Sequence, residues 1–261
     1  MARRSARRTQ VAVVMYLGLL PLELIGTVSA LDGLGLNTGF RTVTVAARRE
    51  PLATDTPLRV APQSTFGAVP RPAALLVPGG RLMSTIQAMG DEGLLAYVRA
   101  TAETAELVAS VGTGALILAA AGLLTGKRAT THRAYRRMLE HLGATYIQER
   151  WVEDGKFVTA GGTSGGIDLA LHLVAKHKGE RTARRVQLWI EYDPQPPFGT
   201  MDWRNGDEDT LAPDLAAHET EWRLALAHRP DLLVAVQAVQ NAASATSHAQ
   251  TETETETDIH W

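Results

Sequence analysis

Short apolar runs, several of them rich in β-branched residues, alternate along this chain with segments of helical character, and this alternation constrains the fold most. Val11–Tyr16, Arg41–Ala46, Ala73–Val77 and Leu107–Val111 have the length and composition of buried strands. Strands that alternate with helices predict an α/β fold, in which helices cover both faces of a doubly wound, mostly parallel sheet. A chain of 261 residues, 45% of them hydrophobic, has enough apolar material for the core of such a sheet.

Residues that typically start a helix, cap it or form a turn predict the remaining elements. Pro21 suits the first turn of a helix, Ser164 is expected to cap another helix, and Asp154-Gly155 is expected to form the turn of a hairpin. The expected helices are Ala115–Leu124, Thr131–His141, Ser164–Lys176, Thr182–Tyr192, Pro213–Ala227 and Pro230–Ala242, the hairpin strands are Tyr146–Val152 and Lys156–Ala160, and Pro194–Phe198 is an extended connector.

We expect one domain at residues 10–240, between a basic tail at residues 1–9 and an acidic Thr/Glu tail at residues 241–261. The acidic tail has too few apolar residues to offset the entropy of ordering, so we expect it to be disordered. The arginine-rich start resembles a secretory signal, but Glu23 interrupts the apolar run that follows it. No stretch reaches the roughly 18 apolar residues that span a bilayer. We therefore expect a cytoplasmic protein with no membrane partner.

The charge and the cysteine count exclude several classes of site. With 26 basic and 28 acidic residues, the formal net charge of the chain is −2. This overall charge gives no reason to expect nucleic acid as a partner. The sequence contains no cysteine, which excludes disulfides, Cys-ligated zinc, iron–sulfur clusters and a thiol nucleophile within it. We expect neither a metal nor a cofactor.

Glycine-rich turns follow three of the expected strands: Pro78-Gly79-Gly80, Gly112-Thr113-Gly114 and Gly161–Gly166. The active crevice of such a sheet lies beyond the carboxyl ends of its strands, and glycines there free backbone N–H groups to bind an oxyanion. Taken alone, each turn is better explained by tight packing between strand and helix. None of the turns matches a phosphate-binding loop or a dinucleotide fingerprint.

Three longer blocks surround these turns: SVGTGALILAAAGLLTGKRATTHRAY at Ser110–Tyr135, VEDGKFVTAGGTSGGIDLALHLVA at Val152–Ala175 and RVQLWIEYDPQPPF at Arg185–Phe198. They resemble the ThiJ/PfpI superfamily of class I glutamine amidotransferase-like proteins, in particular its isonitrile hydratase branch. The resemblance covers most of Gln10–Phe198 and implies a flavodoxin-like three-layer sandwich, here with extra C-terminal helices. Related regulators append a helix-turn-helix domain, for which the roughly 60 residues after Phe198 are too few.

In this family the turn after the fourth strand is a nucleophile elbow that presents a Cys in the pattern S-V-C-T-G-A. This chain has Gly112 at that position. Glycine has no side chain that could form a thioimidate or thioester, so covalent catalysis at Gly112 is impossible. Because glycine tolerates the strained dihedrals of an elbow, we expect the turn to be preserved, with an open pocket above it.

The same resemblance assigns roles to residues around the elbow. Glu23 stands where the family places an acid that handles the proton, Thr113 follows the nucleophile position, and Gly79 and Gly80 belong to the loop of backbone donors. Burial would raise the pKa of the Glu23 carboxyl and suit it to acid–base catalysis near neutral pH. The alternative is that Glu23 only hydrogen-bonds the elbow. For Thr113 we expect a catalytic role or a hydrogen bond to ligand or backbone.

Other residues are candidates for the walls of the crevice. His132 stands in the T-T-H motif of the family. We expect its imidazole to contact the substrate in a structural role, and the alternative is that it acts as a second proton carrier. Gly162 is expected to contact substrate as well. Asp168 is expected to interact with a helix dipole or the local backbone rather than to react. Trp189, Trp203 and Trp222 are expected in the core or at a dimer contact.

These features favour a cofactor-independent enzyme of lyase, isomerase or cyclase type, in which Glu23 performs acid–base chemistry on a small or medium organic molecule. Two alternatives stay open. The first is a ligand-binding protein without turnover, and the second is an isonitrile hydratase inactivated by a Cys-to-Gly substitution. The resemblance also implies a homodimer.

Overall fold

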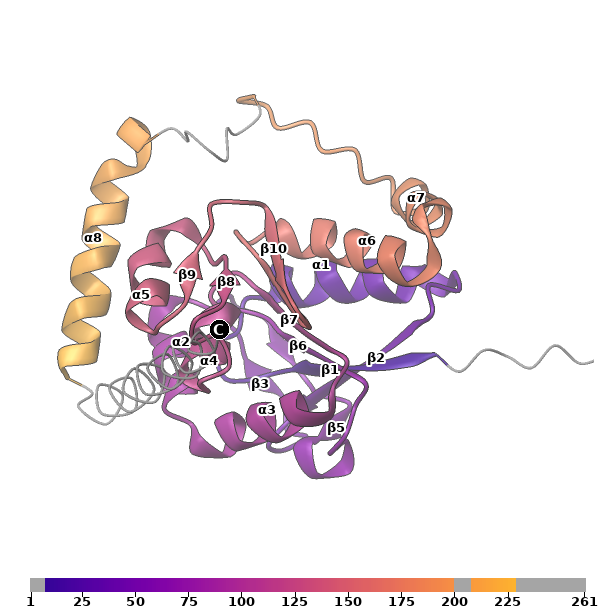
Figure 1. Ribbon diagram of the computed structural model, residues 1–261, viewed down its shortest axis with the longest axis horizontal. Helices are drawn as coiled ribbons and strands as arrows, with labels where there is room; N and C mark the ends of the chain where they lie inside the picture. The colour runs from indigo at the N-terminus through magenta and orange to yellow at the C-terminus, as the bar shows by residue number, and fades with distance from the viewer. Residues whose placement is uncertain (1–7, 200–207, 229–261) are drawn as a thin grey trace, which may run out of the picture.

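The computed structural model describes residues 8–199 and 208–228, with a seven-stranded sheet at its centre (Figure 1). The strand order is β10-β11-β7-β6-β1-β2-β5, and every neighbouring pair is parallel except β10–β11. This confirms the predicted doubly wound, mostly parallel sheet. The strands are β1 Thr9–Val14, β2 Phe40–Ala46, β5 Ser64–Thr65, β6 Ala74–Val77, β7 Leu107–Val111, β10 Trp151–Asp154 and β11 Phe157–Ala160.

Helices cover both faces of the sheet. On one face α1 (Pro21–Asp32) and α6 (Gly165–Lys178) lie side by side, and α7 (Glu180–Trp189) packs against α6 (Figure 1). The opposite face carries α2 (Leu82–Met89), α3 (Glu92–Thr104), α4 (Gly114–Ala120) and α5 (Arg136–His141). The C-terminal helix α8 (Glu208–Ala227) packs against α2 and against the 3-10 turn η3 (Arg133–Tyr135).

Smaller elements lie around this frame. An antiparallel pair, β3 (Leu52–Ala53) and β4 (Arg59–Val60), follows β2, and a parallel pair joins β8 (Arg128–Ala129) to β9 (Thr145–Tyr146). Two further 3-10 turns are η1 (Gly33–Gly35) and η2 (Phe66–Ala68). No helix in the described part of the chain has the length and apolar character needed to cross a membrane.

Several element predictions were wrong in part, because side chains bind tertiary partners. Ser164 stands at the N-cap of α6 without capping it, since its hydroxyl accepts a hydrogen bond from Arg150 instead (3.1 Å). Thr131 is not helical, since its hydroxyl donates to Gly112 O (2.9 Å). Tyr146–Val152 splits into β9 and β10, and α4 stops at Ala120. Helices α2 and α3 were not predicted. The expected helix Pro230–Ala242 and the acidic tail lie outside the described residues, and only residues 8 and 9 of the basic tail are described.

The carboxyl ends of the central strands converge at one edge of the sheet, where the loops after β1, β6, β7 and β11 meet. Leu19 pairs with Gly80 there, and Leu20 N–H donates to Gly79 O (2.8 Å). These bonds join the loop after β1 to the loop after β6. Ligands of doubly wound sheets bind at this edge, so the glycine-rich turns are placed where a site is expected.

Candidate functional site

The turn after β7 has the sharp strand-to-helix geometry expected of an elbow. Gly112 adopts φ +52°, in the left-handed region that favours glycine, and α4 begins two residues later. Gly112 N–H donates to Ala160 O (2.9 Å), and Gly112 O accepts from the Thr131 hydroxyl (2.9 Å). The turn therefore keeps its shape through backbone bonds that need no side chain at position 112.

The Glu23 carboxyl fills the space where an elbow side chain would stand. A Cβ atom built on Gly112 would overlap Oε1 of Glu23 and would lie 2.8 Å from Cδ and from Oε2 of the same residue. The open pocket expected above Gly112 is therefore absent. That expectation was wrong because the longer side chain of Glu23 reaches into the volume that glycine vacates.

The position of Glu23 at the start of α1 directs its side chain towards the elbow. The helix begins at Pro21, so Glu23 lies in its first turn beside the loop after β6, and Gly79 N–H donates to Glu23 Oε2 (2.6 Å). A Cβ at Gly79 would lie 2.7 Å from that oxygen and 2.6 Å from Thr113 N, so this close approach needs glycine. Gly79 thus acts as a backbone donor, as predicted, but its partner is Glu23 itself.

Burial makes Glu23 a weak acid. Its residue is 3% exposed, and desolvation together with the nearby negative charge of Asp55 raises the pKa of the carboxyl to about 8, against the opposing effects of Gly79 N–H and the Thr163 hydroxyl. The carboxyl is therefore largely protonated at neutral pH. Because an N–H group only donates, Oε2 is the acceptor, and the proton of the neutral acid belongs on Oε1.

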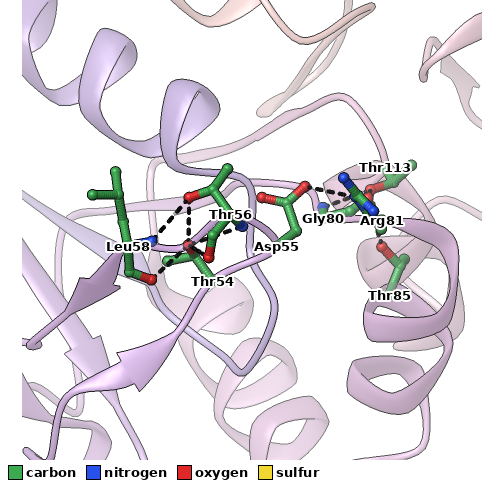
Figure 2. A network of polar contacts seen from close by, with 8 residues as sticks. All are labelled: Thr54, Asp55, Thr56, Leu58, Gly80, Arg81, Thr85 and Thr113. Atoms are coloured by element: carbon green, nitrogen blue, oxygen red, sulfur yellow. Dashed lines mark hydrogen bonds and ion pairs between the residues drawn. The ribbon is translucent and has the colours of Figure 1, made fainter.

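Thr113 pins the elbow to the loop after β6. Its hydroxyl lies 2.9 Å from Gly80 N, 2.8 Å from Gly80 O and 3.0 Å from the Thr85 hydroxyl (Figure 2). All of these groups are buried. The Thr113 side chain thus holds the donor loop in place, and a direct catalytic role for it stays a prediction.

A cavity of about 270 Å³ lies beside the elbow, on the side of η3 and the loop after β11. His132 and Gly162 line it, whereas Gly79, Gly80 and Gly112 are not among its lining residues. That these five residues contact a substrate stays a prediction. Thr163 lines the cavity, and its hydroxyl also lies close enough to Glu23 to lower the pKa of that carboxyl, so it connects the acid to the cavity. The full lining is Leu22, Thr130, Thr131, His132, Arg133, Tyr146, Gln148, Glu149, Gly161, Gly162, Thr163 and Ser164.

His132 presents a neutral imidazole to this cavity. Its Nδ1 accepts a hydrogen bond from Ala134 N–H (3.3 Å), so the ring proton belongs on Nε2. Burial lowers the pKa of His132, and the neighbouring His218 and Arg133 lower it further. The ring therefore carries its N–H on Nε2, and its role as a structural imidazole or as a second proton carrier stays a prediction.

The wall formed by the loop after β11 is held by an ion pair. Arg150 lies 2.6 Å from Asp168 in the first turn of α6, and it also donates to the Ser164 hydroxyl (3.1 Å). Asp168 therefore bonds a tertiary partner as well as lying near the helix dipole. Sequence reasoning missed Arg150 and Thr163, although Thr163 stands inside a glycine-rich turn that it singled out.

The tryptophans divide between core and surface. Trp222 of α8 is buried, as expected for a core residue, whereas Trp189 at the end of α7 is exposed. Trp203 lies outside the described residues.

Comparison with known proteins finds relatives both by sequence and by structure. The family model of the DJ-1/PfpI family matches residues 9–176. Isonitrile hydratase of Pseudomonas putida is 41% identical over 194 residues, which is 74% of this chain and 80% of that protein. A crystal structure of a ThiJ/PfpI family protein from Pseudomonas syringae aligns with a TM-score of 0.71 and 29% identity, over 89% of this chain and 90% of the other. DJ-1beta of Drosophila melanogaster shares the fold, with a TM-score of 0.64 and 19% identity over 72% of this chain and 100% of its own.

Proposed function

Because this chain belongs to the DJ-1/PfpI family, we propose that it is a cofactor-independent, isonitrile hydratase-like enzyme that contains no cysteine and uses Glu23 as general acid and base. One observation carries the proposal. A carboxyl that is protonated near neutral pH occupies the place of the elbow side chain, next to a cavity that Thr163 joins to it. The substrate is a small organic molecule, because a cavity of about 270 Å³ is slightly smaller than the usual range for ligand pockets.

The chemistry follows from the two oxygens of Glu23. Oε2 is held by Gly79 N–H, and Oε1 gives its proton to the substrate when a bond of the substrate is polarised. The carboxylate that results takes a proton back from another position of the same molecule. The net change is an isomerisation, an elimination or a ring closure, and no atom of the protein is consumed. In this proposal the Nε2–H of His132 orients a carbonyl or ether oxygen of the substrate, since His132 lines the cavity.

Loss of the acid is the direct test. We would incubate the purified protein with a cell extract in deuterated water and follow new products and deuterium incorporation by mass spectrometry. Removal of a general acid typically costs 10²–10⁴-fold in rate, so we expect Glu23→Gln to lose turnover on that scale. Glu92→Gln, which removes an exposed carboxylate on α3, should keep it. Unchanged turnover in Glu23→Gln would refute the proposal.

Ligand binding without turnover is a second candidate, and the burial of Glu23 favours it. In this case the cavity selects a ligand while Glu23 only fills the elbow and bonds Gly79. It predicts a molecule that co-purifies with the protein and saturable binding that Glu23→Gln leaves unchanged. No product would form with either protein.

An inactivated isonitrile hydratase is the third candidate, supported by the 41% identity to the Pseudomonas putida enzyme. Gly112→Cys would then restore conversion of an alkyl isonitrile to the formamide. Since the new Cβ would overlap Glu23 Oε1, the thiol can be accommodated only if the Glu23 side chain turns away. No conversion by Gly112→Cys would argue against this candidate.

A further inference from the structure

A groove between α8 and the segment of η3 and α5 lies outside the site described above. It has a volume of about 250 Å³, and we call it the arginine groove. Among the described residues that line it, three are arginines and one is acidic. η3 and α5 contribute Arg133, Arg136 and Arg137, and α8 contributes Leu215, Glu219 and Trp222.

Specific contacts anchor α8 beside α5 (Figure 1). The Nη1 nitrogen of Arg137 donates to both carboxylate oxygens of Glu219 (2.8 and 2.7 Å). Trp222 and Leu226 lie four residues apart on one face of α8 and are 4% and 2% exposed. The arginine groove is therefore bounded by a helix with buried contacts of its own.

Trp222 brings a donor without an acceptor to this groove. Its Nε1–H is buried, and no residue in the described part of the chain accepts a hydrogen bond from it. An indole N–H can only donate. Leaving a buried donor without an acceptor costs free energy, and an acceptor bound beside Trp222 recovers that cost.

Arginines lie on both sides of the Trp222 indole. The guanidinium carbon of Arg223 is 5.0 Å from the centre of the ring. A neighbouring hollow of about 390 Å³ is lined by Trp222 together with Arg137 and Arg223. Because Arg137 also lines the arginine groove, the two hollows are adjacent. An acceptor that reaches the indole from either side therefore meets positive charge.

The arginines of the groove can bind an anion besides the partners that they already have. A guanidinium carries five N–H donors in a planar fork, so one bound carboxylate does not use all of them. Glu219, the acidic residue of the lining, already accepts from Arg137 and from Arg223 (2.9 Å). The lining thus has more positive than negative charge, and its polar hydrogens point to a ligand that accepts.

We propose that the arginine groove binds a small organic oxyanion, a carboxylate or a phosphate ester, through its arginines and the Nε1–H of Trp222. The planar guanidinium matches the geometry of both oxyanions. Ala134 and Leu215 offer apolar surface to the rest of the ligand. A volume of about 250 Å³ limits this ligand to a small molecule.

The arginine groove is separate from Glu23 but shares a wall with the cavity beside the elbow. Arg133 lines both hollows. Ala134 lines the groove, and its N–H bonds Nδ1 of His132, which lines the cavity (3.3 Å). A bound oxyanion therefore contacts the turn that holds His132. Binding in the groove is independent of turnover at Glu23, so either can fail without the other.

The indole N–H of Trp222 reports binding directly. The protein is labelled with nitrogen-15 at tryptophan, and the Trp222 indole signal is assigned through its own backbone amide. It is titrated with inorganic phosphate, with propionate, and with sodium chloride at matched ionic strength. We expect a saturable shift of the Trp222 signal with phosphate or propionate, and no shift for Trp189, which is exposed on α7. The probe that saturates at the lower concentration identifies the ligand as a phosphate ester or a carboxylate.

Arg136→Gln removes one guanidinium from the groove, so we expect the midpoint of the titration to rise about fivefold. Arg184→Gln is the matched control, because Arg184 is an exposed arginine of α7, and it should leave the midpoint unchanged. If Arg136→Gln does not fold, Arg136→Lys replaces it, since lysine lacks the planar fork and should also raise the midpoint.

Two results would overturn the proposal. The first is a Trp222 signal that shows no saturable shift with either probe, or only the shift that sodium chloride also produces. The second is a midpoint that the folded Arg136 variant leaves unchanged, because the oxyanion would then bind outside the arginine groove.

Discussion

At the scale of single residues, Gly112 and Glu23 form one unit. The left-handed backbone at Gly112 and the carboxyl above it both disfavour a side chain at this position. The two effects are separable, since only the second depends on Glu23. Their separation tests whether the carboxyl occupies the elbow in solution.

We expect Gly112→Ala to lower the free energy of unfolding by about 2–4 kcal/mol in the wild type, from the strained φ and the displacement of Glu23 together. In a Glu23→Ala background only the backbone effect remains, so the cost should fall to about 1–2 kcal/mol. Urea unfolding of the four proteins of this cycle measures both values. Equal costs in the two backgrounds would show that Glu23 is not above Gly112.

Glu23 should also make stability depend on pH. Its carboxyl holds its proton up to a pKa of about 8 in the folded chain but only to about 4.5 when solvated, so the folded state binds more protons between these values. The free energy of unfolding therefore falls as pH rises through this window, by up to about 1.4 kcal/mol per pH unit.

Gln does not titrate, so Glu23→Gln should gain stability relative to the wild type as pH rises from about 5 to about 8. Urea unfolding at a series of pH values, taken as the difference between the two proteins, removes the contribution of all other groups. A difference that is constant with pH would mean that Glu23 is ionised in the folded protein.

At the scale of elements, a prediction was right where the local sequence alone decides the secondary structure, and it was wrong where side chains bind residues far away in the sequence. β7 was predicted at Leu107–Val111, where it lies, because a run of buried β-branched and small residues has few alternatives. The helix predicted from Thr131 begins later, and the cap predicted at Ser164 is not formed, because both hydroxyls bind partners far away in the sequence. α2 and α3 were missed, since their apolar residues are mixed with threonine and glycine.

The elements around the cavity show how a wall is held by long-range bonds. Arg150 precedes β10, yet it joins Asp168 and Ser164 at the start of α6 and so fixes the loop that carries Thr163. Partly buried, charge-assisted pairs of this kind give positional precision as well as stability. No spacing rule in the sequence connects Arg150 to Asp168.

At the scale of the whole molecule, an apolar patch near the site suggests how two copies would associate. Leu17, Leu22, Ile25 and Met83 are each at least half exposed, and they come from the loop before α1, from α1 and from the start of α2. Gly18 lies against Ser84, which brings the loop and α2 together. Exposed apolar side chains gathered in one region mark interaction sites, so we propose that a homodimer forms through this patch.

Light scattering after size exclusion should give a dimer for the wild type and a monomer for Ile25→Glu, because a buried charge without a partner disfavours the interface. Leu188→Glu is the matched control, since Leu188 is also apolar and is even more exposed than Ile25 but lies on α7. A monomeric wild type would refute the dimer. Dissociation by Leu188→Glu and not by Ile25→Glu would place the interface elsewhere.

The sequence by itself determined the alternation of strands and helices, the glycine-rich turns at the strand ends, and the absence of a thiol at the elbow. These are local properties, since they depend on composition and on short-range periodicity. It also selected Glu23, His132 and Gly162 as residues of the site, because they stand in motifs.

Only the tertiary structure decided what fills the elbow and what surrounds the acid. The Glu23 carboxyl takes the volume above Gly112, and Thr163 connects it to the cavity. Burial and the charge of Asp55 raise its pKa, whereas Gly79 N–H lowers it. These residues come from the loops or helices that follow β1, β3, β6 and β11 and meet only when the sheet forms. Burial and charge depend on that meeting, so the acidity of Glu23 is a property of the fold and not of its sequence position.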